Sequence, residues 1–194
     1  MEEKAVKERI LRAALELIRE EAAFEKVSMR RVAEKAGVAV SMVNYHFQTK
    51  QNLIDRAVQE FVGSMIEDST PGESEAHANP VEEMRAHLRG AAAFVARNPG
   101  ISRVSIFRDL QAGELGDNSS QVAETVFRQL KPIFEDRKSE QELRVMAQLQ
   151  VAAVQQLFLR AEVNRELTGL DFYDDHDRQI LLDIVIDTIT GVTT

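Results

Sequence analysis

The chain has 194 residues, of which 44% are hydrophobic and 29% are charged, a composition that excludes disorder throughout. The absence of cysteine excludes disulfide bonds and thiolate metal sites, and no run of about 18 apolar residues could span a membrane. The charged N-terminus has no apolar signal core, so we expect a cytoplasmic protein.

The net charge of −8 is unevenly distributed along the chain. Residues 1–50 hold 10 basic and 8 acidic side chains, a net charge of +2, whereas residues 51–194 carry a net charge of −10. Because phosphate repels an acidic surface, we expect only the N-terminal part to face nucleic acid.

Apolar residues recur at helical spacing from the N-terminus onward, and no alternating strand pattern is present. The first helix is expected at about 4–22. The second follows Ser28, a good N-cap, and stops at Gly37, and the third spans about 40–47. A longer helix, capped by Thr49, then starts at Lys50.

The rest of the chain is also predicted to be helical. A polar loop at 67–79 is followed by helices that begin at Pro80 and after Asn98-Pro99-Gly100, and by a helix at about 120–137 that Pro132 is expected to kink or shorten. Ser139 and Glu142 predict a capping box for one helix of ~28 residues, roughly 42 Å long. The final helix, 174–191, is capped by Asp174 or Asp175. The fold class is therefore all-α, with a helix-turn-helix domain at 1–50 and a helical domain at 51–194.

The segment Ser28–Phe47 carries the functional signal. Two short helices joined by a tight turn at Gly37 have the geometry of a helix-turn-helix, whose second helix enters the major groove of DNA. Val43 and Phe47, four residues apart, are expected in the core. The side chains left exposed are expected to be Val40, Ser41, Met42, Asn44 and Tyr45.

The motifs RILRAALELI, SMRRVAEKAGV and VNYHFQTKQNL resemble the TetR family of bacterial transcription regulators over residues ~7–62. Two departures stand out. The family usually has glycine after the first helix, where this chain has Ala22-Ala23-Phe24, and alanine in a left-handed position would be strained by roughly 1 kcal/mol. Asn44 stands where an aromatic residue is commoner, which affects only the bases that are read.

The motif position of each side chain implies its role on DNA. Tyr45 and Lys50 are expected to bind phosphate, and the start of the second helix, at Ser28 and Arg30, favours a phosphate as well. His46 is expected to be packed or bonded to phosphate. Base reading is expected from Val40, Ser41, Met42 and Asn44. The alternative for the arginines and lysines is an ordinary solvated face.

The resemblance also implies a small-molecule pocket in the C-terminal domain and a largely apolar effector, with Arg108 or His87 as a polar anchor. Methionine and phenylalanine at helical spacing are also typical of plain core, so that alternative stays open. The expected wall residues are Phe61, Met65, Met84, His87, Leu88, Phe107, Arg108, Phe127 and Phe158.

The last two helices, 139–167 and 174–191, are the most apolar and are expected to form a homodimer interface as an intersubunit four-helix bundle. The alternative is that the final helix is a central core helix.

Asp174–Asp177 is better explained by helix capping than by a metal site. No catalytic constellation or cofactor motif occurs, so neither an enzyme nor a cofactor is expected.

These expectations predict a homodimeric repressor that a small-molecule effector releases from a pseudo-palindromic, double-stranded DNA operator. Two alternatives remain. One is an activator or an effector-free architectural DNA-binding protein. The other is a ligand-binding or enzymatic helical protein that has lost DNA binding.

Overall fold

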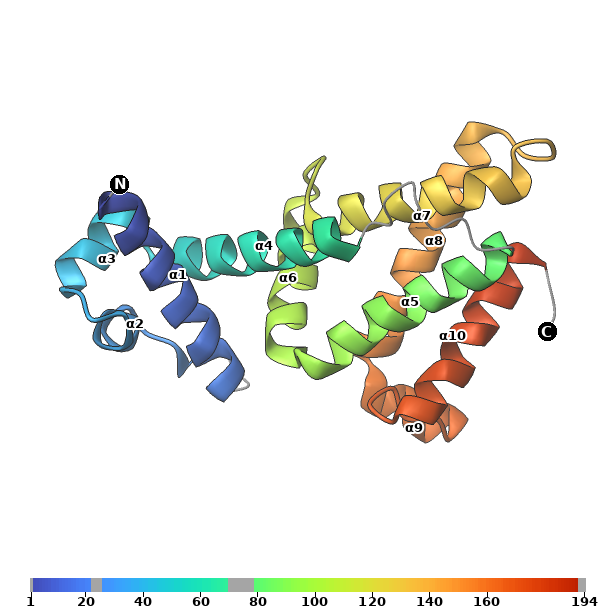
Figure 1. The fold of residues 1–194 in the computed structure, drawn as a ribbon. Helices are drawn as coiled ribbons and strands as arrows, with labels where there is room; N and C mark the ends of the chain where they lie inside the picture. Colours follow the sequence, from blue (N-terminus) through green and yellow to red (C-terminus); the bar gives the residue numbers. More distant parts are fainter. Residues whose placement is uncertain (1, 22–25, 70–78, 192–194) are drawn as a thin grey trace. The chain divides into compact units, whose positions relative to one another are not determined.

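The computed structural model describes residues 2–21, 26–69 and 79–191, and within these ranges the chain is helical with no strand (Figure 1). The helices are α1 (Glu2–Glu21), α2 (Met29–Ala36), α3 (Val40–Phe47), α4 (Lys50–Ser69), α5 (Pro80–Arg97), α6 (Pro99–Ala112), α7 (Asn118–Phe134), α8 (Glu140–Leu159), α9 (Ala161–Thr168) and α10 (Asp175–Thr190). The all-α fold class is confirmed. The expected strain at Ala22-Ala23 and most of the polar loop at 67–79 lie outside the described residues.

The chain divides into two compact units. Unit 1 consists of Met1–Met65 and Asn98–Glu114, and unit 2 consists of Ile66–Arg97 and Leu115–Thr194. These units are defined by packing alone, so the functional division at residue 50 stays a prediction.

The core of unit 1 is formed where α1, α2, α3, α4 and α6 meet. Each helix contributes the apolar residues that recur on one of its faces, which is the arrangement that burial of an amphipathic helix requires. Ile10, Ile18, Val32, Val43 and Ile54 are fully excluded from solvent. This core holds the short helices α2 and α3, of eight residues each, which would be marginal in isolation.

Unit 2 is a bundle in which α7 and α8 pack against each other and α5 and α10 pack alongside them. Its core is apolar apart from a few polar side chains. The buried hydrophobic residues include Met84, Leu88, Ala92, Phe127, Leu130, Leu143, Ala147, Phe158, Leu182 and Ile186.

A buried arginine joins α5 to α10. Arg85 is 2% exposed and donates to Asp183 and Asp187 at 2.9 Å each, and the more exposed Arg89 also donates to Asp183. Burial acts to lower the pKa of Arg85, but the hydrogen bonds to the Asp187 and Asp183 carboxylates outweigh it and raise the pKa. A buried charge is tolerated only when it is paired in this way.

The expected single helix at 139–166 is wrong. The chain forms α8 and α9, separated at Arg160, whose φ of −116° and ψ of 32° are not helical. The Asn164 side-chain amide donates to the carbonyls of Gln156 and Leu157 at 3.3 Å and so satisfies acceptors at the end of α8.

Most of the helix ends agree with the sequence patterns. The Ser139–Glu142 capping box is present, Asp174 caps α10 by accepting from the backbone N–H groups of His176 and Asp177, and Pro80 opens α5. Helix α6 begins at Pro99, two residues earlier than expected, because proline is well accommodated in the first turn of a helix. The helix expected at 120–137 instead covers 118–134, and it ends two residues after Pro132.

No helix in the described part of the chain is both long and apolar enough to cross a membrane.

Candidate nucleic-acid interface

The turn between α2 and α3 is closed by local hydrogen bonds. Ser28 caps α2 by accepting from the backbone N–H of Arg31 at 3.3 Å. Gly37 ends the helix in the left-handed conformation, with φ of 64° and ψ of 40°, and its N–H and that of Val38 satisfy carbonyls of the last turn. The residue types that predicted this turn are those that its geometry requires.

Helix α3 has one buried face and one exposed face, as expected. Val43 is 0% exposed and Phe47 is 5% exposed, both in the core of unit 1. Tyr45 is 70% exposed on the opposite face, and Val40 and Met42 are large apolar side chains left in solvent. Ser41 and Asn44 are exposed as well. An eight-residue helix with this surface can present side chains to base edges and phosphates.

The junction between α3 and α4 is a tight turn that the sequence pattern did not predict. Gln48 has φ of 58° and ψ of −46°, the one positive φ at a non-glycine residue within the described ranges. The Thr49 N–H donates to the Phe47 carbonyl at 2.6 Å, which closes a strained γ-turn. The Thr49 hydroxyl then accepts from the Asn52 N–H at 3.1 Å and caps α4, so that Lys50 begins this helix directly beside the end of α3.

Two basic side chains of α2 have different surroundings. Lys35 lies 2.6 Å from a Glu20 carboxylate oxygen and 3.4 Å from Glu16, and these contacts, led by the hydrogen bond to Glu20, raise its pKa. Lys35 is therefore tied to α1. Arg30 is exposed and forms no ion pair with any described residue, so its guanidinium is available to a phosphate.

His46 is half-buried between its neighbours. Its ring lies edge-on to that of Tyr45, with centroids 5.2 Å apart, and 6.1 Å from the ring of Phe47. Its Nε2 atom is buried and has no hydrogen-bond partner among the described residues. This environment is that of a packed histidine.

The side chains expected to line an effector pocket are divided between the two units. Phe61 and Met65 on α4, and Phe107 and Arg108 on α6, belong to unit 1, where Phe107 is 54% exposed. In unit 2, Met84, Leu88 and Phe127 are buried in the core and His87 is half-buried. Phe158 is fully buried against the rings of Phe172 and Tyr173, with centroids 5.8 Å and 6.4 Å away. The effector role of these residues stays a prediction.

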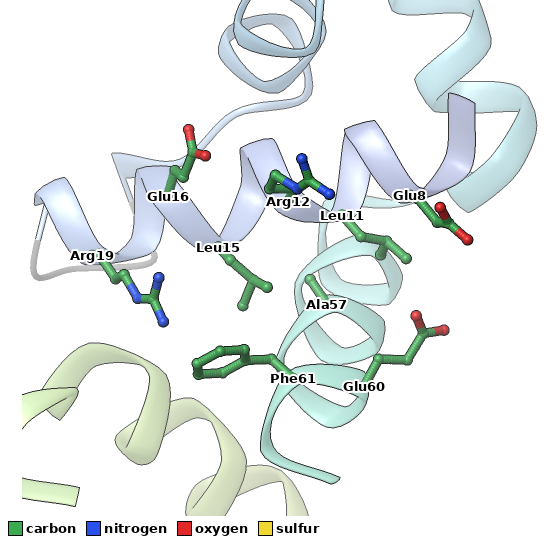
Figure 2. Close-up of a pocket in the computed structure, with 9 residues that line it drawn as sticks. All are labelled: Glu8, Leu11, Arg12, Leu15, Glu16, Arg19, Ala57, Glu60 and Phe61. Atoms are coloured by element: carbon green, nitrogen blue, oxygen red, sulfur yellow. The ribbon is translucent and has the colours of Figure 1, made fainter. Parts of the chain in front are cut away.

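Unit 1 contains an open groove of about 500 Å³ between α1 and α4 (Figure 2). Leu11, Leu15, Ala57 and Phe61 contribute apolar surface, and the Arg19 guanidinium lies over the Phe61 ring, 4.6 Å from its centroid. Charged side chains complete the lining: Glu8, Arg12, Glu16, Arg19 and Glu60. Of these residues, only Phe61 was expected from the sequence to line a ligand site.

Gln150 is a polar core residue that the sequence analysis missed. It lies on α8, is 1% exposed, and its Oε1 atom has no hydrogen-bond partner within the described part of the chain. Its spacing from Leu143 and Ala147 places it on the buried face of the helix, and a glutamine at an apolar position was the signal that could have found it.

The Ser28 cap of α2, the left-handed Gly37 and the exposed face of α3 together have the geometry of a helix-turn-helix, the motif of a class of DNA-binding proteins. Residues 10–57 match the family model described as bacterial regulatory proteins of the tetR family. Residues 10–57 therefore carry the DNA-binding domain of the tetR family of regulators, and the chain as a whole has the fold of solved TetR-family proteins.

The similarity to individual proteins is low in sequence but extends over most of the fold. The nucleoid occlusion factor SlmA of Vibrio vulnificus is 24% identical over 134 residues, 68% of each chain. A transcriptional regulator from Rhodococcus sp. Rha1 is 22% identical, with a TM-score of 0.70 over 97% of this chain and 99% of its own. Thermus thermophilus FadR, a TetR-family repressor solved with lauroyl-CoA, is 18% identical, with a TM-score of 0.65 over 97% and 96%. These three proteins are described as a nucleoid occlusion factor, a transcriptional regulator and a transcriptional repressor.

Proposed function

We propose that this regulator is a homodimeric repressor that binds a pseudo-palindromic operator through α3 and is released by a small, largely apolar effector. The observation that carries the proposal is the exposed face of α3, where Tyr45 is 70% exposed while Val43, two residues earlier, is 0% exposed. A core-anchored helix that leaves such side chains in solvent is suited to the major groove.

The contacts on DNA are proposed as follows. Tyr45 and Lys50 bind phosphates on either side of the turn at Gln48, and Ser28 and Arg30 present the N-terminus of α2 to another phosphate. Base edges are read by Val40, Ser41, Met42 and Asn44. Phosphate contacts set position and affinity, and only the base contacts confer sequence preference.

Two recognition helices in a homodimer would enter successive major grooves, about 34 Å apart. An effector that binds better to one arrangement of the dimer would shift this separation, because α4 starts at Lys50, directly after the recognition helix. The solved complex of FadR with lauroyl-CoA supports an effector with a large apolar portion.

The test is DNA binding measured by fluorescence anisotropy on fragments that flank the protein's own gene, over a range of salt concentrations. Tyr45→Phe removes one hydroxyl that donates to phosphate, and we expect roughly a tenfold weaker affinity on every bound fragment. Lys50→Ala is expected to weaken binding and to reduce the slope of log affinity against log salt by about one.

The chain has one other tyrosine, Tyr173, which lies in unit 2 and provides the matched control. Tyr173→Phe should leave the affinity unchanged. Normal binding by both the Tyr45→Phe and Lys50→Ala variants would overturn the proposed interface.

A second candidate is a DNA-binding factor that no effector releases. The similarity to SlmA, which is described as a nucleoid occlusion factor and not as a repressor, extends over 134 residues, well beyond the helix-turn-helix segment. The two candidates differ in one measurement. Addition of an effector abolishes operator binding by the repressor and leaves the binding of such a factor intact.

A further inference from the structure

The core of unit 2 contains a neutral polar group that its surroundings leave unsatisfied. The Gln150 side chain is 1% exposed, and Oε1 is buried with no hydrogen-bond partner among residues 2–21, 26–69 and 79–191. A buried carbonyl without a donor loses the hydrogen bonds that it makes in water, so native proteins rarely keep one without a reason.

Helix α8 places this amide among apolar side chains. Leu143 and Ala147 lie seven and three residues before Gln150, on the same face of the helix, and both are buried. This face of α8 belongs to a bundle in which α5, α7 and α10 all pack against α8. A polar atom with this setting is suited to orient a bound molecule that is otherwise apolar.

The buried cations of unit 2 are already neutralised. Arg85 donates to Asp183 and Asp187 at 2.9 Å, and Arg178 pairs with Asp175 and donates to the Phe172 carbonyl at 3.0 Å. An anionic group that entered this core would have to compete with these carboxylates. A neutral ligand has no such cost.

We infer that the Gln150 amide is the polar anchor of the effector site in unit 2 and selects a neutral, largely apolar effector that carries a hydroxyl or N–H group. The donor of the effector bonds to Oε1 while the apolar remainder packs against the helices around α8. The inference rests on the proposed function, since it assigns the chemistry of the effector that the proposal requires.

The test uses two probes, 4-hexylphenol and its methyl ether, 4-hexylanisole, in which a methyl group replaces the hydroxyl hydrogen and so removes the donor. Binding of each to the full-length protein is measured by isothermal titration calorimetry. We expect the phenol to bind about tenfold more tightly than the ether, the effect of one hydrogen bond in a dry site. In Gln150→Leu and Gln150→Met this preference should fall to less than twofold, with the affinity for the ether retained.

Gln155→Leu is the matched control, because Gln155 also lies on α8 but its amide already donates to Ser119 at 2.9 Å. This variant should keep the preference for the phenol. The urea midpoint gives a second readout. It should not fall in Gln150→Leu, since the substitution removes an unsatisfied buried group.

The possible failures are distinguishable. Equal binding of both probes to the wild type, or an unchanged preference in Gln150→Leu, would overturn the anchor role while leaving an apolar effector intact. A fall in the urea midpoint of Gln150→Leu would show that water already satisfies the amide, and would overturn the inference too. Binding of neither probe would count against both the anchor and the apolar effector of the proposed function.

Discussion

Gly37 shows how one residue fixes the turn between α2 and α3. Its φ of 64° lies in the left-handed region, where a side chain is disfavoured, and no atom lies within 4 Å of the position that a Cβ would occupy. The requirement for glycine at this position is therefore conformational and not steric.

Substitution of Gly37 tests this requirement. Gly37→Ala should lower the free energy of unfolding by about 1 kcal/mol, because the left-handed conformation is disfavoured for alanine even where its Cβ meets no neighbouring side chain. Urea denaturation monitored by circular dichroism measures the change. Gly90→Ala is the control: Gly90 lies inside α5 with no atom within 4 Å of its Cβ position, and alanine there should stabilise by roughly 0.5–1 kcal/mol. Equal changes in stability at the two positions would contradict a conformational requirement for glycine at position 37.

At the scale of single residues, the sequence predicted the two faces of α3 because Val43 and Phe47 are four residues apart and apolar. It could not show that Lys35 is tied to Glu16 and Glu20, because these partners come from a different helix. Pairings of that kind depend on how helices pack, which local periodicity does not contain.

At the scale of whole elements, the start of α10 depends on a carboxylate. Asp174 accepts hydrogen bonds from the N–H groups of Asp177 and His176, and these lower the pKa of its carboxyl below the ordinary value, the bond from Asp177 contributing most. A lowered pKa in the folded state means that the ionised cap stabilises the protein above the unfolded pKa. This stabilisation is lost as the pH falls through the folded pKa.

Asp174→Asn separates the cap from its charge. Asparagine caps helices about as well as aspartate, so the stability of the variant near neutral pH should remain close to that of the wild type. Between about pH 6 and about pH 3 the variant should lose less stability than the wild type, because its cap does not titrate. Urea midpoints at the two pH values give the measurement. Asp136→Asn, at an exposed acid that caps no helix, is the control; an equal effect there would show that the cap is not the cause.

Helix ends were predictable where a specific residue makes them. Gly37, Ser139 and Asp174 each act through their own side chain or backbone conformation, and each could be identified from the sequence. The break at Arg160 has neither glycine nor proline. It is accompanied by the Asn164 side-chain hydrogen bonds and by the packing of Phe158 against Phe172, contacts that form only when the chain folds.

At the scale of the whole molecule, unit 2 exposes apolar side chains on helices that pack against each other. Val145 and Leu149, one turn apart on α8, are each 58% exposed, and Ile184 on α10 is 56% exposed. Exposed apolar surface of this kind is typical of a surface that another protein covers. The proposed occupant is a second copy of this chain, since a symmetric interface would place the same residues of α8 and α10 on both sides.

The double variant Leu149→Glu with Ile184→Glu tests this interface. Charges introduced on both sides of a symmetric interface repel, so sedimentation velocity should show a change from twice the chain mass to the single chain mass of 21.8 kDa. Operator affinity should fall by on the order of a hundredfold, because each helix-turn-helix would then bind its half-site without a linked partner. Leu167→Glu, at a leucine on α9 that is 78% exposed, should leave both the mass and the affinity unchanged. If the double variant remained dimeric, the dimer would have to form through a different surface. If the wild type were a monomer at operator-binding concentrations, the proposed repressor would have to bind one half-site at a time.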